Sequence, residues 1–302
     1  MSEHDAINIE NIPQNVLQGC FEEDAALYAE RIAYLESNVT QYRLLGANNE
    51  PKGYILQEND GELQNYIDDR IEFFKSRYDS ISPLNIAGWK DWNQRSNGSC
   101  TSMGGTHAAQ ATQGFNYLFG TPLTYTNWNP LYLYMYGKGF RYSDGENLWK
   151  FAKNMVEVGN SPVYLAGEDC VSRNITRAMW EKTNAAQYQT SICSLSRMEN
   201  VVRFLQAGFG IMFGSNYIPT AINESGDVTK ATSGAHCMAL CGWDYRREMP
   251  WYQNSWGNSY INRQSGGFIK RSSLERFNIF GRFGNPIAMI ATEFKLALLN
   301  NL

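Results

Sequence analysis

A thiol, an imidazole and a carboxamide occur in an order that could support nucleophilic catalysis. Cys100 follows the run of residues 93–99, and His236 and Asn254 lie far downstream. The thiol would be the nucleophile, the imidazole its base, and the amide would orient the base. Because the chain has only three histidines, few bases for this thiol exist.

Further residues could stabilise the intermediate that forms when a thiolate attacks a carbonyl. Negative charge then develops on oxygen, so hydrogen-bond donors must already point at it. The side-chain N–H of Gln94 and the backbone N–H of Cys100 can supply such donors. Gly98 has no Cβ and lets a substrate backbone approach closely. Trp256 would shield the contact between imidazole and amide from water.

These segments resemble the catalytic blocks of papain-like cysteine peptidases. Gln94 stands six residues before Cys100, and the His236 and Asn-Ser-Trp-Gly (254–257) blocks follow in the family's order and near its usual spacing. The resemblance covers roughly residues 88–273 and implies an α+β, two-lobe fold. It implies an active-site cleft between a helical lobe with Cys100 and an antiparallel β lobe with His236 and Asn254. No metal or cofactor is implied.

The groove that would bind substrate departs from the family pattern. Thr101 replaces an aromatic residue, and Asn97 replaces a cysteine that usually forms a disulfide. Where relatives have a Gly-Gly pair that binds substrate backbone, this chain has Asp144-Gly145-Glu146. We therefore expect Gly98, Gly145, Glu146 and Trp256 to border a remodelled groove. An exposed Glu146 carboxylate there would favour basic substrate side chains.

Small or apolar residues at positions 103, 104, 108, 111, 115 and 118 have helical spacing, which predicts a helix that begins near Cys100. The N–H groups and macrodipole at a helix start favour a thiolate, and a neighbouring imidazolium would lower the thiol pKa further. The expected resting state is a thiolate–imidazolium pair. His107 lies about 10 Å along the same helix, too far for proton transfer, and is interpreted as a core or helix-face residue.

Composition limits the other classes of function. The chain has 302 residues, 43% of them hydrophobic, and a net charge of −4, which suffices for an ordinary core. The absence of a basic run gives no support for nucleic-acid binding. No stretch approaches the roughly 20 apolar residues of a membrane span, and residues 1–5 are unlike a signal peptide. We expect a location in the cytoplasm or a virus particle.

The six cysteines show no spacing typical of a disulfide framework. They are Cys20, Cys100, Cys170, Cys193, Cys237 and Cys241. On a strand, positions 237 and 241 would be about 13 Å apart, beyond disulfide reach. A metal site would need more histidines than the chain offers. Free thiols in a reducing compartment are the favoured interpretation.

The chain divides into a helical N-terminal segment, residues 1–85, and a peptidase domain, residues 86–302, with a C-terminal extension from about 277. Helices are predicted at 22–45 and 62–78, then at 146–158 and 197–206. Strands are predicted at 209–213, 237–243, 251–254 and 267–270. The N-terminal segment resembles a family pro-segment in position and helicity, or it docks on a protein partner; docking is slightly favoured.

The sequence therefore predicts a thiol peptidase that hydrolyses peptide or isopeptide bonds of a peptide or protein substrate. Cys100 would be the nucleophile, His236 the base and then the acid, Asn254 the orienting group and Gln94 the oxyanion donor. The alternative is a non-catalytic structural or assembly protein, for example of a virus particle, that keeps the fold for docking.

Overall fold

The computed structural model describes residues 18–41, 55–120, 125, 127–141, 143–160, 175–179, 190–257 and 265–291, with side chains omitted from 34–41. His4 and Cys170 lie outside these residues. Within them, no helix combines the length and apolar character needed to cross a membrane.

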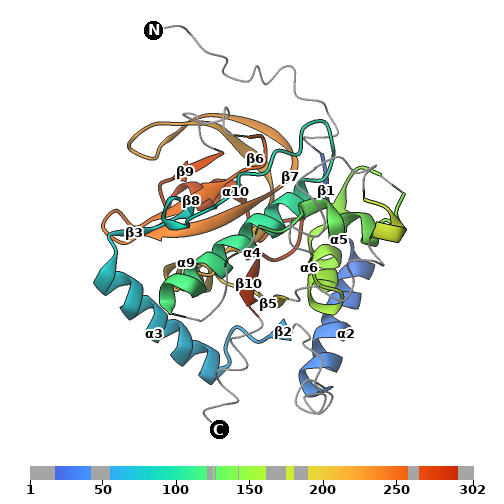
Figure 1. The fold of residues 1–302 in the computed structure, drawn as a ribbon, viewed down its shortest axis with the longest axis horizontal. Coiled ribbons are helices and arrows are strands. Elements are labelled where there is room, and N and C mark those ends of the chain that lie inside the picture. The colour runs from blue at the N-terminus through green and yellow to red at the C-terminus, as the bar shows by residue number, and fades with distance from the viewer. Residues whose placement is uncertain are drawn as a thin grey trace, which may run out of the picture.

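The described helices surround one long central helix, α4 (Cys100–Phe119), as Figure 1 shows. On one side of α4 lie the neighbouring helices α5 (Pro130–Gly137) and α6 (Leu148–Glu157), and on the other lies the main sheet. The remaining helices are α2 (Ala25–Gln41), α3 (Gly61–Arg77), α9 (Met198–Gln206) and α10 (Ser273–Phe277). The molecule therefore has a helical side and a β-rich side that meet along α4.

The main sheet has eight strands and is mostly antiparallel. Its order is β2 (Ile55–Leu56), β5 (Thr190–Ser194), β10 (Ile287–Ala291), β6 (Ile211–Ile222), β7 (Val228–Asp244), β8 (Met249–Gln253) and β9 (Gly266–Phe268), and β3 (Ser80–Ile81) pairs with β7. A separate two-stranded sheet joins β1 (Cys20–Phe21) to β4 (Glu146–Asn147) in parallel. The α+β class and the division into a helical and a β side are confirmed.

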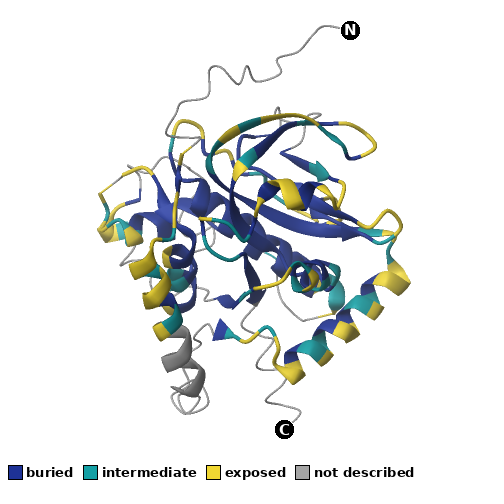
Figure 2. Cartoon of the chain, turned by 180° about the vertical axis from the view of Figure 1, so that it is seen from behind, coloured by how far each residue is buried: buried dark blue, intermediate teal, exposed yellow. Residues whose placement is uncertain are grey.

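Helix α4 is buried over most of its length, which explains its many small residues (Figure 2). A Cβ on Gly105 would lie 2.5 Å from the Phe151 ring of α6, and one on Gly104 would lie 2.9 Å from the Cys237 sulfur of β7. Glycine at these two positions lets α4 approach both neighbours closely. The helix is thus fixed between the two sides of the molecule.

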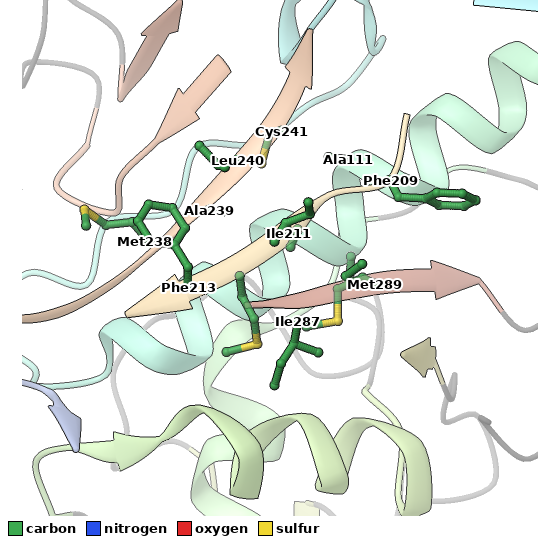
Figure 3. Close-up of a cluster of buried hydrophobic side chains, with 14 of the residues drawn as sticks. Ala111, Phe209, Ile211, Phe213, Met238, Ala239, Leu240, Cys241, Ile287 and Met289 are labelled. Carbon is green, nitrogen blue, oxygen red and sulfur yellow. The ribbon is translucent and has the colours of Figure 1, made fainter. Parts of the chain in front are cut away.

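The core lies between α4 and the centre of the sheet. Figure 3 shows side chains of β6, β7 and β10, among them Ile211, Leu240 and Met289, gathered beside α4. All three are fully buried. Strand β10 lies between β5 and β6, so the predicted C-terminal extension from about residue 277 supplies an interior strand.

The N-terminal segment is also built into this fold. Strand β2 pairs with β5, and β3 pairs with β7. The buried Arg70 of α3 donates hydrogen bonds to Ala207 O at 2.6 Å and to Asn116 Oδ1 at 2.6 Å. Residues 55–81 are therefore part of the same packed body as the residues that come after them.

The predicted helices occur within about four residues of their expected ends, but two strands are longer than predicted: β6 continues to Ile222 instead of ending at 213, and β7 begins at Val228 instead of 237. The helix predicted from residue 146 begins at Leu148, because Glu146 and Asn147 form β4. The Asn147 side chain accepts hydrogen bonds from the backbone N–H groups of Trp149 and Lys150 and so caps α6. Helix α5 was not predicted as a separate element.

Candidate active site

Cys100 is the first residue of α4, as predicted. Its sulfur accepts a hydrogen bond from the backbone N–H of Cys237 at 3.3 Å. Cys237 lies on β7 directly after His236, so the helical and β-rich sides meet at the thiol. The arrangement brings the first two predicted catalytic blocks together.

The imidazole of His236 contacts the third block. Its Nε2 lies 2.8 Å from Asn254 Oδ1, and both residues are buried. Asn254 Oδ1 also accepts from the backbone N–H of Ser255 at 2.8 Å, which fixes the amide. The Trp256 ring lies 5.0 Å from the imidazole, centroid to centroid, at 41°, and is itself buried. The expected orienting and shielding contacts are present.

Gln94 links the nucleophile block to the Asn254 block. Its backbone N–H donates to Ser255 O at 2.8 Å, and its Oε1 accepts from Ser255 Oγ at 2.5 Å. The side-chain amide nitrogen donates to Asn97 O at 2.8 Å. Because an amide NH₂ has two hydrogens, one N–H remains for another acceptor.

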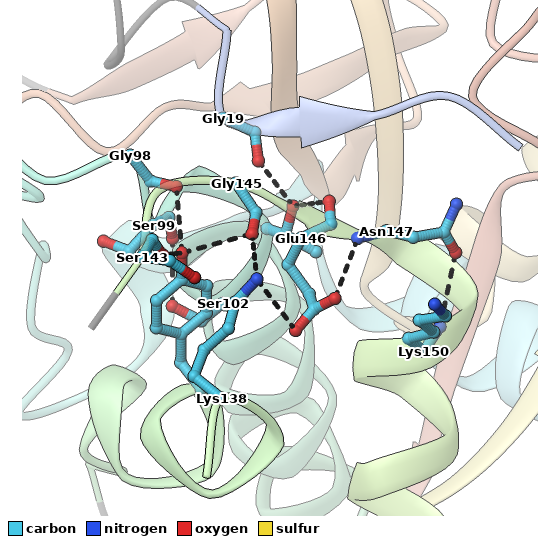
Figure 4. A network of polar contacts seen from close by, with 12 residues as sticks. Gly19, Gly98, Ser99, Ser102, Lys138, Ser143, Gly145, Glu146, Asn147 and Lys150 are labelled. Carbon is cyan, nitrogen blue, oxygen red and sulfur yellow. Dashed lines mark hydrogen bonds and ion pairs between the residues drawn. The ribbon is translucent and has the colours of Figure 1, made fainter. Parts of the chain in front are cut away.

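Residues 18–22, which we call the strap, lie over the thiol. Gly19 O accepts from the backbone N–H of Glu146 at 2.9 Å, and β1 runs parallel to β4 (Figure 4). A Cβ on Gly19 would stand 2.7 Å from Gly98 O and 2.9 Å from the Cys100 sulfur. Only a glycine fits there without displacement of the strap.

Because the strap covers the Cys100 thiol, the thiol pKa shifts upward, opposite to the expected direction. Cys100 is fully buried, and burial raises its pKa well above the ordinary value; the nearby Cys20 thiol raises it further, and the hydrogen bond from Cys237 partly opposes the shift. The predicted resting thiolate is therefore wrong for this closed arrangement. The helix start is present, but the strap excludes the water that would solvate the charge.

Gly98, Gly145 and Glu146, which we predicted to border a substrate groove, contact the strap. Gly145 donates its N–H to Gly98 O at 2.8 Å, and a Cβ on Gly145 would lie 2.1 Å from the Phe21 ring. The backbone N–H of Glu146 donates a hydrogen bond to Gly19 O of the strap. These residues now hold a segment of the chain's own N-terminal part.

The Glu146 side chain differs from the expected exposed carboxylate. It is buried, and its Oε2 lies 3.7 Å from Lys138 Nζ, which also donates to Gly145 O. Burial raises the Glu146 pKa, and the Lys138 charge opposes that shift. The expectation that this carboxylate selects basic substrates is corrected, because the Lys138 cation already faces it.

Other residues at the site were not predicted. Thr101 Oγ1 donates to Glu146 O at 3.0 Å and so ties α4 to β4. Lys138 and Cys237 lie beside the strap, and Cys20 is part of it. No spacing pattern marks them, because each is brought there by pairing between distant segments; only the departure from the family pattern at Thr101 pointed to this place.

His107 is a core residue, in agreement with the prediction. It is fully buried, accepts the backbone N–H of Trp92 on Nε2 at 3.1 Å, and stacks on Trp89. Burial lowers its pKa to about 4, and the nearby Asp91 opposes the shift. Among the described residues, no group of three or more His, Cys, Asp or Glu side chains could hold a metal ion.

Comparison with known proteins shows the fold. No family model and no curated protein matches the sequence. The structure is similar to xylellain, a cysteine protease from Xylella fastidiosa, with a TM-score of 0.51 and 16% identity over 70% of this chain and 85% of that one. It is also similar to digestive procathepsin L 3 of Tenebrio molitor larval midgut, with a TM-score of 0.52 and 9% identity over 88% and 90%. The chain therefore has the papain-like fold that its sequence predicted.

Proposed function

We propose that this chain is a cysteine peptidase that hydrolyses peptide or isopeptide bonds through an acyl-enzyme on Cys100. The observation that carries the proposal is the 2.8 Å contact between His236 Nε2 and Asn254 Oδ1. The residue after His236, Cys237, donates its backbone N–H to the Cys100 sulfur. An oriented imidazole on the strand that contacts a thiol at a helix start supplies the base and the nucleophile that covalent catalysis needs.

Each side chain has a defined task in this reaction. His236 takes the thiol proton, and the thiolate attacks the substrate carbonyl. The N–H groups of Gln94 and Cys100 stabilise the negative oxygen of the intermediate. His236 then gives its proton to the leaving amine, and water releases the acyl group from the sulfur. Asn254 keeps the ring in the correct orientation throughout.

We propose further that the described arrangement is a latent state. The strap pairs with β4 where a substrate backbone would lie, and Gly19 covers the nucleophile. Helix α2, the next element after the strap, lies beside α6, where Lys153 Nζ is 3.5 Å from Glu30 Oε1. The strap, rather than this helix, would therefore be the inhibitory element.

Burial of Cys100 also favours the second candidate function, a non-catalytic scaffold that keeps the fold for docking. A closed cleft over a protonated thiol would suit a protein whose role is assembly. The two candidates differ in their activity once the strap is lifted, because only the peptidase would then turn over a peptide.

Gly19→Ala tests both candidates in the full chain. The added methyl group would displace the strap, whereas Gly61→Ala is a matched control because a Cβ there meets no atom within 4 Å. Iodoacetamide labelling of Cys100 and cleavage of a peptide library should both accelerate in Gly19→Ala and stay unchanged in Gly61→Ala. Faster labelling without cleavage would favour the scaffold, and no change in labelling would contradict latency.

A further inference from the structure

Three buried thiols meet at the start of α4. Cys100 comes from α4, Cys237 from β7 and Cys20 from the strap, and all three are free cysteines. The peptidase reaction uses only Cys100. The other two are brought together by segments from opposite ends of the chain, and the catalytic roles leave them unexplained.

Two independent contacts place Cys20 against Cys237. The two side chains are hydrogen-bonded to each other. In addition, a Cβ on Gly214 would lie 3.0 Å from the Cys20 sulfur, and Gly214 is the residue that pairs with Cys237 across the β6–β7 ladder. The absence of a side chain at Gly214 makes room for the Cys20 sulfur beside Cys237.

We propose that Cys20 and Cys237 are a disulfide-forming pair that locks the strap over Cys100 under oxidising conditions and releases it under reducing conditions. The oxidant would be a low-molecular-weight disulfide such as glutathione disulfide. The regulatory consequence rests on the proposed function, whereas the formation of the bond does not.

Cys237 is a better partner for Cys20 than Cys100 is. Gly19 covers the Cys100 sulfur, which also accepts a hydrogen bond from the backbone N–H of Cys237. Cys20 lies within hydrogen-bonding reach of the Cys237 side chain, whereas no such hydrogen bond joins it to Cys100. A disulfide between Cys20 and Cys237 therefore leaves the Cys100 thiol unmodified, so that it can act as the nucleophile after reduction.

The chemistry is a two-step thiol–disulfide exchange. When the strap opens, the Cys20 thiolate attacks glutathione disulfide, forms a mixed disulfide and expels one glutathione thiolate. Cys237 then attacks the Cys20 sulfur and expels the second. Two S–H bonds are lost and one S–S bond forms, while the two protons and two electrons convert one glutathione disulfide to two glutathione molecules.

Noncovalent contacts already hold the segment that carries Cys20. Glu23 donates its N–H to Arg282 O at 2.9 Å, and its carboxylate accepts two hydrogen bonds from Arg31, at 2.7 and 3.0 Å. These contacts anchor the strap just after Cys20 and keep it near β7. A covalent link between Cys20 and Cys237 would suppress the remaining local opening.

Peptide mapping of the full-length chain tests the proposal. The protein is incubated in glutathione buffers of increasing disulfide content, both as purified and during refolding from urea, then alkylated and digested without reduction. We expect the Cys20 peptide to be linked to the Cys237 peptide. The link should disappear in Cys20→Ala and Cys237→Ala and persist in Cys241→Ala, a matched control four residues along the same strand.

The rate of iodoacetamide labelling at Cys100 gives a second readout. Oxidised protein should label at least about tenfold more slowly than reduced protein, and Cys20→Ala should remove that dependence. A Cys20 peptide that stays unlinked in both preparations, or links to Cys100 instead, would overturn the proposal. A redox-dependent labelling rate without peptide cleavage by reduced Gly19→Ala protein would retain the lock and reject the peptidase.

Discussion

Gly19 is placed so that a Cβ on it would lie 2.9 Å from the sulfur of Cys100. Two opposite effects on the thiol therefore coexist. A helix start stabilises a negative charge by about 0.3–1 kcal/mol, and by ~2 kcal/mol in partly buried geometries. Removal of water from a buried charge costs several kcal/mol, so burial dominates while the strap is closed. Without the strap, the helix start and His236 would decide the ionisation.

The first prediction concerns the balance between the helix start, which favours the Cys100 thiolate, and burial, which disfavours it. In Gly19→Ala, the Cys100 pKa should fall, because displacement of the strap lets water reach the thiolate. The pH profile of iodoacetamide labelling, measured by mass spectrometry of the Cys100 peptide, should therefore shift to lower pH than in the wild type. The Gly61→Ala profile should overlay the wild-type one. An unshifted Gly19→Ala profile would show that something other than the strap protonates the thiol.

The second prediction concerns Cys100→Ala. In a Gly19→Ala background, peptide cleavage should be abolished, since no other described thiol lies at a helix start beside an imidazole-bearing strand. The sulfur is buried, so its removal should also cost about 1 kcal/mol of unfolding free energy. Urea denaturation measures the second effect and cleavage of a peptide library the first. Residual cleavage by Cys100→Ala protein, free of contaminating protease, would remove this residue from the reaction.

The third prediction separates the two described histidines. In a Gly19→Ala background, His236→Ala should lower kcat by about 10³-fold or more, because the base and the nucleophile act as a unit. His107→Ala should change kcat only a few-fold, although loss of the acceptor for the Trp92 N–H should cost about 1–3 kcal/mol of stability. Equal losses of kcat in the two variants would mean that the base is assigned incorrectly.

The fourth prediction concerns the oxyanion donor. In a Gly19→Ala background, Gln94→Ala should lower kcat by about 10²- to 10³-fold, because its N–H acts on the intermediate. The rate of Cys100 alkylation should change far less, since alkylation forms no oxyanion. Ser255→Ala is the matched control: it removes the hydroxyl that bonds Gln94 Oε1 but leaves the amide donor in place. A loss in Ser255→Ala as large as in Gln94→Ala would indicate a structural role.

The sequence predicted the candidate site residues but not the strap that covers them. Cys100 begins a helix because small residues recur at helical spacing after it, and His236 and Asn254 were found through the resemblance. The pairing of Cys20 with Glu146 joins two strands of two residues each, too short for any periodic signal. Helix α5 is similar: its alternating Leu and Tyr residues obscure the helix, although Asn129 and Pro130 are start signals and the Asn129 side chain does cap it.

The last prediction concerns the stability of the protein in acid. Burial holds the folded-state pKa of His107 at about 4, below its ordinary value of 6.5. The unfolded chain therefore binds more protons between these two values, and stability should fall as the pH is lowered through 6.5 toward 4, by at most about 3 kcal/mol from this residue. Urea unfolding at pH 7.5 and at pH 5 measures the loss. His107→Gln, which cannot be protonated and keeps an acceptor for Trp92, should show a smaller difference between the two pH values than the wild type. If both proteins lose equal stability, other groups are responsible for the acid sensitivity.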